Sequence, residues 1–362
     1  MQKGQNILLV GAGGIGSEVA HLLIKGYTGS ITIVDMDKIE LSNLNRQSFF
    51  TLQDISQYKA EILSRSIAAL SSNAIESRFF TQDITSAFFT VEFFKKFSCI
   101  LSCVDNIPAR KHISRMSVLS GVPVIESGTA GYDGEVYIIF PKKTECYECR
   151  EVSDAKVYPI CTLRRTPTEW HHCVHWAKYD EVGNRGAEDT LESIHRISAA
   201  RAVQYNIEVQ DISVTKEILD KTIPSVITTN ALVANLIILQ MDMLEKGVLH
   251  NIYYLDRNSI RRVKGIAPYA KCRVCGPTAH TIEIEKTTSL QDILRHLQIE
   301  VCEDTVVLKD TSLIYDTEYT DLLCTPLISL GVQTGTILKV LNNEISHMIY
   351  ISVNESRTAR HN

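Results

Sequence analysis

Two Cys-x-x-Cys pairs are the residues of this chain whose types and spacing are best suited to chemistry. The pairs are Cys146 with Cys149 and Cys272 with Cys275. Four thiolates complete a tetrahedral shell, so the spacing predicts a closed structural zinc site. Closing the long loop between the pairs costs on the order of 4 kcal/mol, less than the roughly 10–16 kcal/mol that a structural zinc contributes. The alternative is two unrelated pairs, one of them a redox dithiol.

A lone cysteine, Cys161, lies between the two pairs in a segment flanked by prolines and is followed by Arg164 and Arg165. Guanidinium charge favours the thiolate and lowers the pKa of a thiol, which suits a nucleophile. The alternative is a buried and inert cysteine, as most free cysteines are. A rival set of tightly spaced metal ligands is Cys161, His171, His172, Cys173 and His175.

A glycine-rich segment near the N-terminus fits the pattern G-x-G-x-x-G between an apolar strand and a helix. Such a loop lets the backbone approach a phosphate at a helix N-terminus. Its residues are Gly11, Ala12, Gly13, Gly14, Ile15 and Gly16. Asp35 follows the next strand, within the range of a ribose-binding acid. On these features alone a dinucleotide site is favoured, with a turn that binds nothing as the alternative.

Other charged residues weigh against a dehydrogenase. Arg46 follows the second strand in the stretch 43–47, Lys59 stands near a helix start, and Asp105 follows a strand. The two cations could neutralise a triphosphate while Asp105 holds Mg²⁺. Each of them alone is typically a solvated surface charge, but the carboxyl ends of parallel strands share one sheet edge. The set therefore suits nucleotidyl transfer better than hydride transfer.

Composition and hydropathy predict a soluble intracellular protein. A net charge of −5 favours neither nucleic acid nor a membrane surface. Ten cysteines without a secretory signal indicate a reducing compartment. The most apolar stretch, 225–244, is interrupted by Asn230, Asn235, Gln240 and Asp242, which predicts a buried helix rather than a membrane span. Nothing in the sequence separates the nucleus from the cytoplasm.

The order of expected elements predicts an α/β domain with an insertion and a C-terminal module. Apolar strands are expected at 6–10, 31–34, 100–104, 122–125 and 252–255, with helices at 59–70 and 191–205. After residue 280, a strand, a helix with a capping box at Ser289 and Asp292, and three short strands suit a ubiquitin-like β-grasp module. The expected domains are 1–160 and 223–278 for the α/β part, 161–222 for the insertion, 279–355 for the β-grasp module and 356–362 for a tail.

In this order the motifs resemble the catalytic subunits of the enzymes that activate ubiquitin-like modifiers. The resemblance covers nearly the whole chain, including the crossover 223–230. The stretches 125–132, 144–149 and 172–178 make the chain similar to the SUMO branch in particular, and the cullin-modifying branch is the nearest rival. The resemblance implies a Rossmann-like adenylation domain of the ThiF/MoeB type, with a short inserted catalytic-cysteine segment and a C-terminal β-grasp ubiquitin-fold domain.

The resemblance also implies roles for individual residues. Cys161 takes the place of the nucleophile, the paired cysteines hold structural Zn²⁺, and Asp105 holds Mg²⁺. The cluster from His171 to His175 is then structural. The implied ATP contacts are Gly11, Ala12, Gly13, Gly14, Ile15, Gly16, Asp35, Asn43, Leu44, Asn45, Arg46, Lys59, Ile84, Thr85, Asp105, Asn106 and Arg110.

The implied reaction is adenylation of the modifier's C-terminus by ATP, thioester formation on Cys161 and transfer to the cysteine of a carrier enzyme. The implied partners are a non-catalytic subunit of similar fold, which completes a heterodimer, the modifier (SUMO) and the carrier enzyme. The inserted segment is shorter than is usual in the family, and 56–58 depart from its pattern. Alternatives from other classes are a sulfur-carrier adenylating enzyme and a NAD-dependent oxidoreductase.

Overall fold

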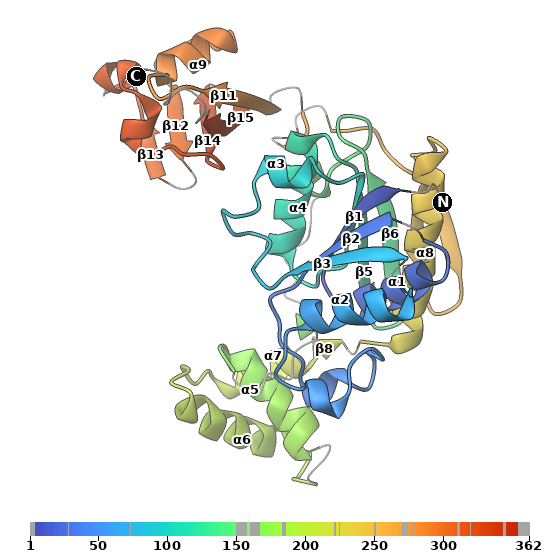
Figure 1. Ribbon diagram of the computed structural model, residues 1–362. Coiled ribbons are helices and arrows are strands. Elements are labelled where there is room, and N and C mark those ends of the chain that lie inside the picture. Colours follow the sequence, from blue (N-terminus) through green and yellow to red (C-terminus); the bar gives the residue numbers. More distant parts are fainter. Residues whose placement is uncertain are drawn as a thin grey trace, which may run out of the picture.

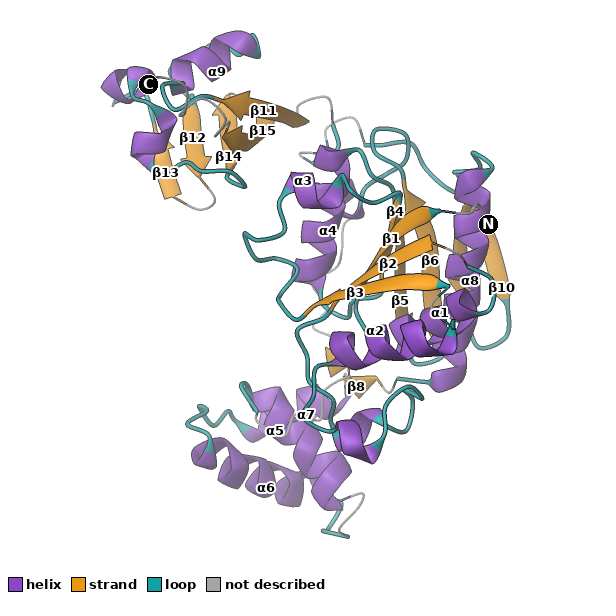
Figure 2. Cartoon of the chain, viewed as in Figure 1, coloured by secondary structure: helices purple, strands orange, loops and turns teal. Residues whose placement is uncertain are grey.

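The structure is a computed structural model that describes most residues of the chain. The described residues are 4–27, 29–72, 74–149, 158–159, 167–182, 186–220, 222–223, 225–249, 251–269, 272, 274–276, 279–309, 312–318, 320–342 and 345–353. Cys161, the predicted nucleophile, lies outside them. Figures 1 and 2 show a large sheet with helices on both faces, a group of inserted helices on one side of it, and a C-terminal module on another.

Eight strands form the large sheet, in the order β10-β9-β6-β5-β4-β1-β2-β3. They are β1 (Gln5–Val10), β2 (Gly29–Val34), β3 (Ile75–Phe80), β4 (Cys99–Ser102), β5 (Val124–Ala130), β6 (Asp133–Ile139), β9 (Asn251–Leu255) and β10 (Ile260–Lys264). The strands from β3 to β5 run parallel, and β6, β9 and β10 continue the sheet antiparallel. The predicted parallel sheet is confirmed, and its antiparallel extension was not predicted.

The central strands carry apolar side chains on both faces because helices cover both faces of the sheet. In β1, Ile7 and Leu9 belong to one core, whereas Leu8 and Val10 belong to the other. Successive side chains of a strand point to opposite faces, so a strand covered on both sides is apolar throughout. The first core packs under α1 (Gly14–Ile24), α2 (Lys59–Leu70) and α8 (Ile227–Glu245), and the second under α3 (Val91–Phe94) and α4 (Ile107–Ser120).

Among the described residues, α8 is the one helix long and apolar enough to cross a membrane by length and composition. It packs against α1, β5 and β6, and 44% of its most apolar window is buried in the protein. Core helices meet the same criterion, and the predicted buried helix at 225–244 corresponds to α8.

The insertion contains α5 (Trp170–Trp176), α6 (Leu191–Gln204) and α7 (Ile212–Asp220), which pack around a small core of their own. Its two connections to the sheet domain lie side by side, because β7 (Tyr158–Pro159) pairs in parallel with β8 (Thr222–Ile223). The backbone of Ser225 then bridges Gly131, at the end of β5. The predicted domain boundaries at 161 and 222 stay predictions.

The C-terminal module is a five-stranded sheet with one helix, and its strand order is β11-β15-β14-β12-β13. Its elements are β11 (Ala279–Ile284), α9 (Leu290–His296), β12 (Val306–Lys309), β13 (Ser312–Tyr315), β14 (Ile337–Asn342) and β15 (Ile345–Val353). The predicted capping box is present, because the Ser289 hydroxyl accepts from Asp292 N and the Asp292 carboxylate accepts from Ser289 N. The predicted strand, helix and three later strands are present, β13 is a further strand that was not predicted, and the assignment as a β-grasp module stays a prediction.

Candidate functional site

The glycine loop joins β1 to α1 at the carboxyl edge of the parallel sheet. Gly11 has a φ of +97°, and a Cβ on it would lie 2.5 Å from the carbonyl oxygen of Cys103. A Cβ on Gly16 would lie 2.0 Å from the carbonyl oxygen of Gly11, so helix and loop also approach too closely for a side chain. At Gly13 a Cβ would meet nothing within 4 Å. A Cβ on Gly14 would lie 2.4 Å from Asn230 Nδ2, so the loop is packed tightly at Gly11, Gly14 and Gly16 and open at Gly13, where its backbone can face a phosphate.

Asp35 holds this loop from the neighbouring strand. Its carboxylate accepts from Ala12 N at 2.6 Å and from Asp37 N at 2.8 Å. Burial raises the pKa of Asp35, and the adjacent Lys59 opposes that rise. The sequence suggested a ribose contact for Asp35, and the structure shows that the side chain also fixes the conformation of the loop.

Lys59 starts α2 and is buried beside two acids. Its Nζ lies 2.9 Å from Oδ2 of Asp37. Burial by itself lowers the pKa of Lys59, but the carboxylates of Asp35 and Asp37 outweigh it, so the pKa lies above its ordinary value. Asp105 contributes to the same effect. The structure thus brings Lys59, Asp35 and Asp105 to one region, as the shared-edge argument predicted, with Asp37 as an unpredicted partner.

The stretch after β2 is ordered by its own polar side chains. Asn43 is buried, and its Oδ1 accepts from Glu40 N at 3.0 Å. Arg46 donates from Nη1 to the carbonyl oxygen of Ser42 at 2.7 Å and to Oδ1 of Asn45 at 3.1 Å. Leu44 ends the 3₁₀ turn that Asn43 closes. These contacts hold the turn in place, and the predicted ATP contacts of its residues stay predictions.

The segment after β3 carries the predicted adenine contacts. Ile84 is buried and Thr85 is exposed. Thr85 N donates to Oδ1 of Asp83 at 2.8 Å, which forms a local turn. The segment starts at the same sheet edge as the glycine loop, because Asp35 N donates to the carbonyl oxygen of Phe80, the last residue of β3, at 3.2 Å.

Asp105 lies exposed just past β4, and a buried ion pair braces its strand end. Asn106 caps α4, since its Oδ1 accepts from Ala109 N at 2.9 Å. Arg110 on α4 pairs with the buried carboxylate of Glu126 on β5. The same guanidinium also donates to the carbonyl oxygens of Val104 and Ser127, both at 2.6 Å.

Arg110 thus joins the residue that precedes the predicted magnesium ligand to the middle of β5. Burial raises the pKa of Glu126, and the Arg110 guanidinium opposes that rise. The resemblance implied that Arg110 contacts ATP, and no role was predicted for Glu126. The signal that could have found Glu126 is an acid directly after the apolar residues Val124 and Ile125 of a parallel strand, because a buried acid requires a partner.

We expect Glu126→Gln to lower the free energy of unfolding by about 3–5 kcal/mol, because it leaves the Arg110 charge buried without its counter-ion. Urea titration of the variant and the parent chain measures the difference. Glu92→Gln is the matched control, since it breaks an exposed pair with Lys95 and should cost at most about 1 kcal/mol. Equal effects of the two substitutions would contradict the bracing role.

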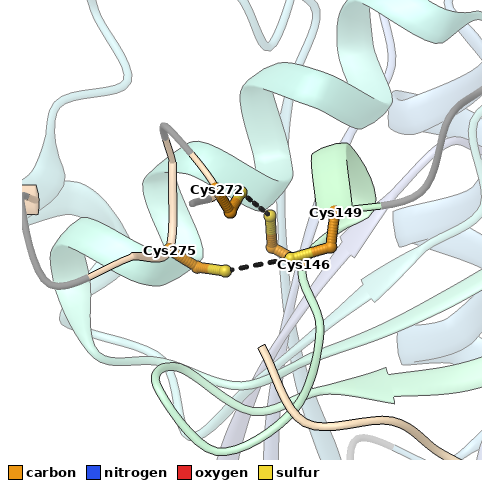
Figure 3. A group of neighbouring side chains, drawn as sticks. All are labelled: Cys146, Cys149, Cys272 and Cys275. Atoms are coloured by element: carbon orange, nitrogen blue, oxygen red, sulfur yellow. Dashed lines mark hydrogen bonds between the residues drawn. The ribbon is translucent and has the colours of Figure 1, made fainter. Parts of the chain in front are cut away.

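Figure 3 shows the two cysteine pairs facing one another. The Sγ atoms of Cys146 and Cys272 lie 3.6 Å apart, those of Cys149 and Cys275 lie 3.2 Å apart, and all four lie within 4.8 Å of one another. A zinc ion with four sulfurs at about 2.3 Å requires sulfur–sulfur distances of about 3.8 Å, so the donor set fits this ion. The four cysteines are free thiols.

The cluster also ties three segments of the fold together. Cys146 precedes a 3₁₀ turn (Tyr147–Cys149) that packs on α4, and Cys149 is its last residue. Tyr147 N donates to the Ser114 hydroxyl at 3.1 Å. Arg115 of α4 makes a bidentate pair with Glu148, at 2.6 and 2.7 Å. These contacts hold the first pair in position against the second, which arrives 123 residues after Cys149 (272 − 149).

We expect Cys272→Ser to abolish stoichiometric zinc binding and to destabilise the chain by several kcal/mol, since a structural zinc contributes folding energy directly. Metal content by mass spectrometry and the melting temperature measure the two effects. Cys324→Ser, which alters an exposed cysteine outside the cluster, should change neither. A full complement of zinc in the Cys272 variant would contradict the assignment.

The rival histidine cluster forms no metal-binding group among the residues that the structure describes. His172 Nδ1 accepts from Thr168 N and Glu169 N, both at 3.2 Å, at the start of α5. His175 and Cys173 are buried in the small core of the insertion, and burial lowers the pKa of His175 to about 4. These residues hold α5 in place, in agreement with the structural role that the resemblance implied.

A glycine loop, a strand-end acid and a zinc-type cysteine cluster on a doubly wound sheet define the class of α/β nucleotide-binding proteins. The chain belongs to the ThiF family, whose match covers residues 3–344. The fold is also that of a solved structure of E. coli MccB with ATP, which aligns with 75% of this chain and 66% of that chain at a TM-score of 0.50. The sequence identity is 17%, so this likeness concerns the fold alone.

Curated relatives agree with that family. The chain is 36% identical over 239 residues to the ubiquitin-activating enzyme E1-like protein of Saccharomyces cerevisiae, and 42% identical over 172 residues to SUMO-activating enzyme subunit 2 of Dictyostelium discoideum. These matches cover 60% and 48% of this chain but only 37% and 26% of the relatives. The Nedd8-activating enzyme E1 catalytic subunit of Drosophila melanogaster is 31% identical over 356 residues, covering 86% of this chain and 76% of the relative.

Proposed function

We propose that this chain activates a ubiquitin-like modifier with ATP. The modifier's C-terminal carboxylate attacks the α-phosphorus of ATP, the bond to the pyrophosphate oxygen breaks, and pyrophosphate leaves. The Cys161 thiolate then attacks the acyl carbon, the bond to the AMP oxygen breaks, and a thioester remains. The observation that carries the proposal is the meeting of the glycine loop, Lys59 and Asp105 at one sheet edge, in a chain of the ThiF family.

Each group at this edge has a task in the proposed reaction. The glycine loop, Asp35 and the turn containing Asn43 and Arg46 bind the nucleotide, and the Lys59 ammonium balances the charge of the phosphates. Mg²⁺ held by Asp105 would supply further charge stabilisation. The ion pair of Lys59 with Asp37 keeps the ammonium charged and positioned before ATP arrives. A zinc ion held by the four cysteines would have a structural task, since this donor set leaves no position for a substrate.

The backbone around the insertion supports the assignment of Cys161 as the nucleophile. Cys161 follows the end of β7 by two residues, and Ser225 follows the end of β8 by two residues. Two residues reach at most about 7 Å. Because β7 pairs with β8 and Ser225 bridges Gly131, the strand that precedes Cys161 in the sequence is connected through β8 to the end of β5. A short movement of the inserted segment would then bring the sulfur to an adenylate.

We propose SUMO as the modifier, with the cullin-modifying protein NEDD8 as the second candidate. The identity to the SUMO-activating subunit is higher, 42% against 31%, over a shorter part of the chain. The names of these relatives designate subunits, which supports a partner subunit of similar fold and a heterodimer. In this proposal the C-terminal module recruits the carrier enzyme.

Incubation with ATP, Mg²⁺ and each candidate modifier tests the function. A partner subunit is supplied, and the products are run on gels with and without a reducing agent. We expect an adduct on this chain that disappears on reduction and forms with SUMO in preference to NEDD8. Preference for NEDD8 would assign the second candidate, and nucleotide titration showing binding of NAD instead of ATP would overturn the proposal.

A further inference from the structure

The C-terminal module is fastened to the large domain by one face of its last strand. Met348 and Tyr350 of β15 are buried in the core beneath α3 and α4, whereas the alternate residues Ile349 and Ile351 belong to the module's own core. Thr281 of β11 adds a hydrogen bond from its hydroxyl to the carbonyl oxygen of Leu119 at the end of α4, at 3.4 Å. The strand therefore serves two cores at once.

The Tyr350 hydroxyl reaches the beginning of α3. Val91, the first residue of that helix, donates from its backbone N to Tyr350 Oη at 2.9 Å, and the pair is buried. Thr90 caps the same helix, since its hydroxyl accepts from Phe93 N at 3.4 Å, and it is also in hydrogen-bonding contact with Tyr350. The first backbone N–H groups of a helix have no partner within it. Tyr350, 259 positions away in the sequence, supplies an acceptor for the first of these groups.

From α3 a continuous set of contacts leads to the nucleotide edge. Phe93 lies edge-to-face against Phe80, with ring centroids 5.5 Å apart, and against Phe89 at 4.9 Å. Phe80 ends β3, and its carbonyl oxygen accepts from Asp35 N at 3.2 Å. Asp35 in turn holds Ala12 N of the glycine loop. Tyr350 is thus connected to the loop through four packed or hydrogen-bonded contacts.

We propose that Tyr350 is a positioning residue through which the C-terminal module orders the segment 83–94 beside the nucleotide site. With the hydroxyl in place, the first N–H group of α3 is paired, and the aromatic side chains of this helix hold the end of β3 against β2. Without it, the segment loses a fixed start and the ATP-binding conformation becomes less populated. The inference rests on the proposed function only in taking ATP as the ligand.

Direct binding of Mg-ATP, measured by calorimetry on the full chain, tests the proposal. Tyr350→Phe removes one hydrogen bond and keeps the ring, so ATP should bind about fivefold more weakly. In ATP–pyrophosphate exchange the KM for ATP should rise while kcat stays within about twofold. Tyr315→Phe is the matched control, because Tyr315 is a buried tyrosine in the core of the same module, and it should leave ATP binding unchanged.

The parent chain gives a second measurement that needs no folded variant. Coupling between two sites is reciprocal, so if docked Tyr350 favours ATP binding, ATP must favour the docked strand. Saturating Mg-ATP should slow amide hydrogen exchange severalfold in the peptides covering 89–94 and 345–353. It should have no such effect in a peptide covering 306–315.

The outcomes separate the two proposals. If the parent chain binds no ATP, the proposed function fails. If it binds ATP, but Tyr350→Phe has the same affinity and Mg-ATP leaves amide exchange in 89–94 and 345–353 unchanged in the parent chain, the positioning role is wrong and the proposed function stands. If Tyr315→Phe weakens ATP binding as much as Tyr350→Phe, the effect is general destabilisation of the module, which also overturns the positioning role.

Discussion

Cys161→Ala is expected to eliminate the thioester between this chain and its modifier while ATP–pyrophosphate exchange remains measurable. Adenylation needs only the carboxylate, ATP and the groups at the sheet edge, whereas the second step needs the sulfur as its nucleophile. A gel without reducing agent detects the thioester, and radiolabelled pyrophosphate detects exchange. In the proposed reaction Cys161 is the only acceptor of the acyl group on this chain, so no other cysteine should replace it.

Cys324→Ser is the matched control, because this cysteine is exposed and lies in the C-terminal module. It should form the thioester as the parent chain does. A Cys161 variant that loses exchange together with the thioester would show that the residue supports the structure and is not the nucleophile. A variant that still forms a reducible adduct would place the nucleophile elsewhere.

The second large effect is expected at Asp105, the predicted magnesium ligand. Asp105→Ala should slow ATP–pyrophosphate exchange by at least about a hundredfold, since a metal and its ligands stabilise charge that develops on the phosphates. The side chain is exposed, so the melting temperature should stay nearly unchanged. Exchange by the variant over a range of Mg²⁺ concentrations measures the effect.

Asp304→Ala, in an exposed position of the C-terminal module, controls for the loss of one surface carboxylate. Exchange by this variant should equal that of the parent. Normal exchange by Asp105→Ala would remove the assigned metal role and leave Lys59 and Arg46 as the charges at this edge.

Local patterns predicted the features that depend on local physics. The strand, glycine turn and helix at the N-terminus follow from an apolar run and glycines at the positions where side chains would collide. The capping box at Ser289 and Asp292 follows from spacing within one helical turn. The two cysteine pairs were predicted to meet because zinc requires four ligands, and their sulfur atoms do lie together.

Features that depend on distant partners were not predictable in this way. Glu126 and Asp37 matter because of Arg110 and Lys59, which other elements carry to them. Tyr350 looks like any aromatic residue of a strand until the fold places it against α3. Strand β10 was missed because all its residues are exposed, so it carries no apolar pattern. Helix α5 was missed because its histidines and tryptophans obscure the helical period.

The central claim is that one sheet edge, furnished with a glycine loop, cations and an acid, adenylates the C-terminus of a ubiquitin-like modifier. Modifier-dependent ATP–pyrophosphate exchange by this chain with a partner subunit tests it most directly. The account predicts that label enters ATP only when a modifier with an intact C-terminus is present, and that none enters with a modifier shortened at that end. Exchange at the same rate with and without a modifier would contradict the account. So would a lack of exchange when ATP, Mg²⁺, the partner subunit and either SUMO or NEDD8 are all present.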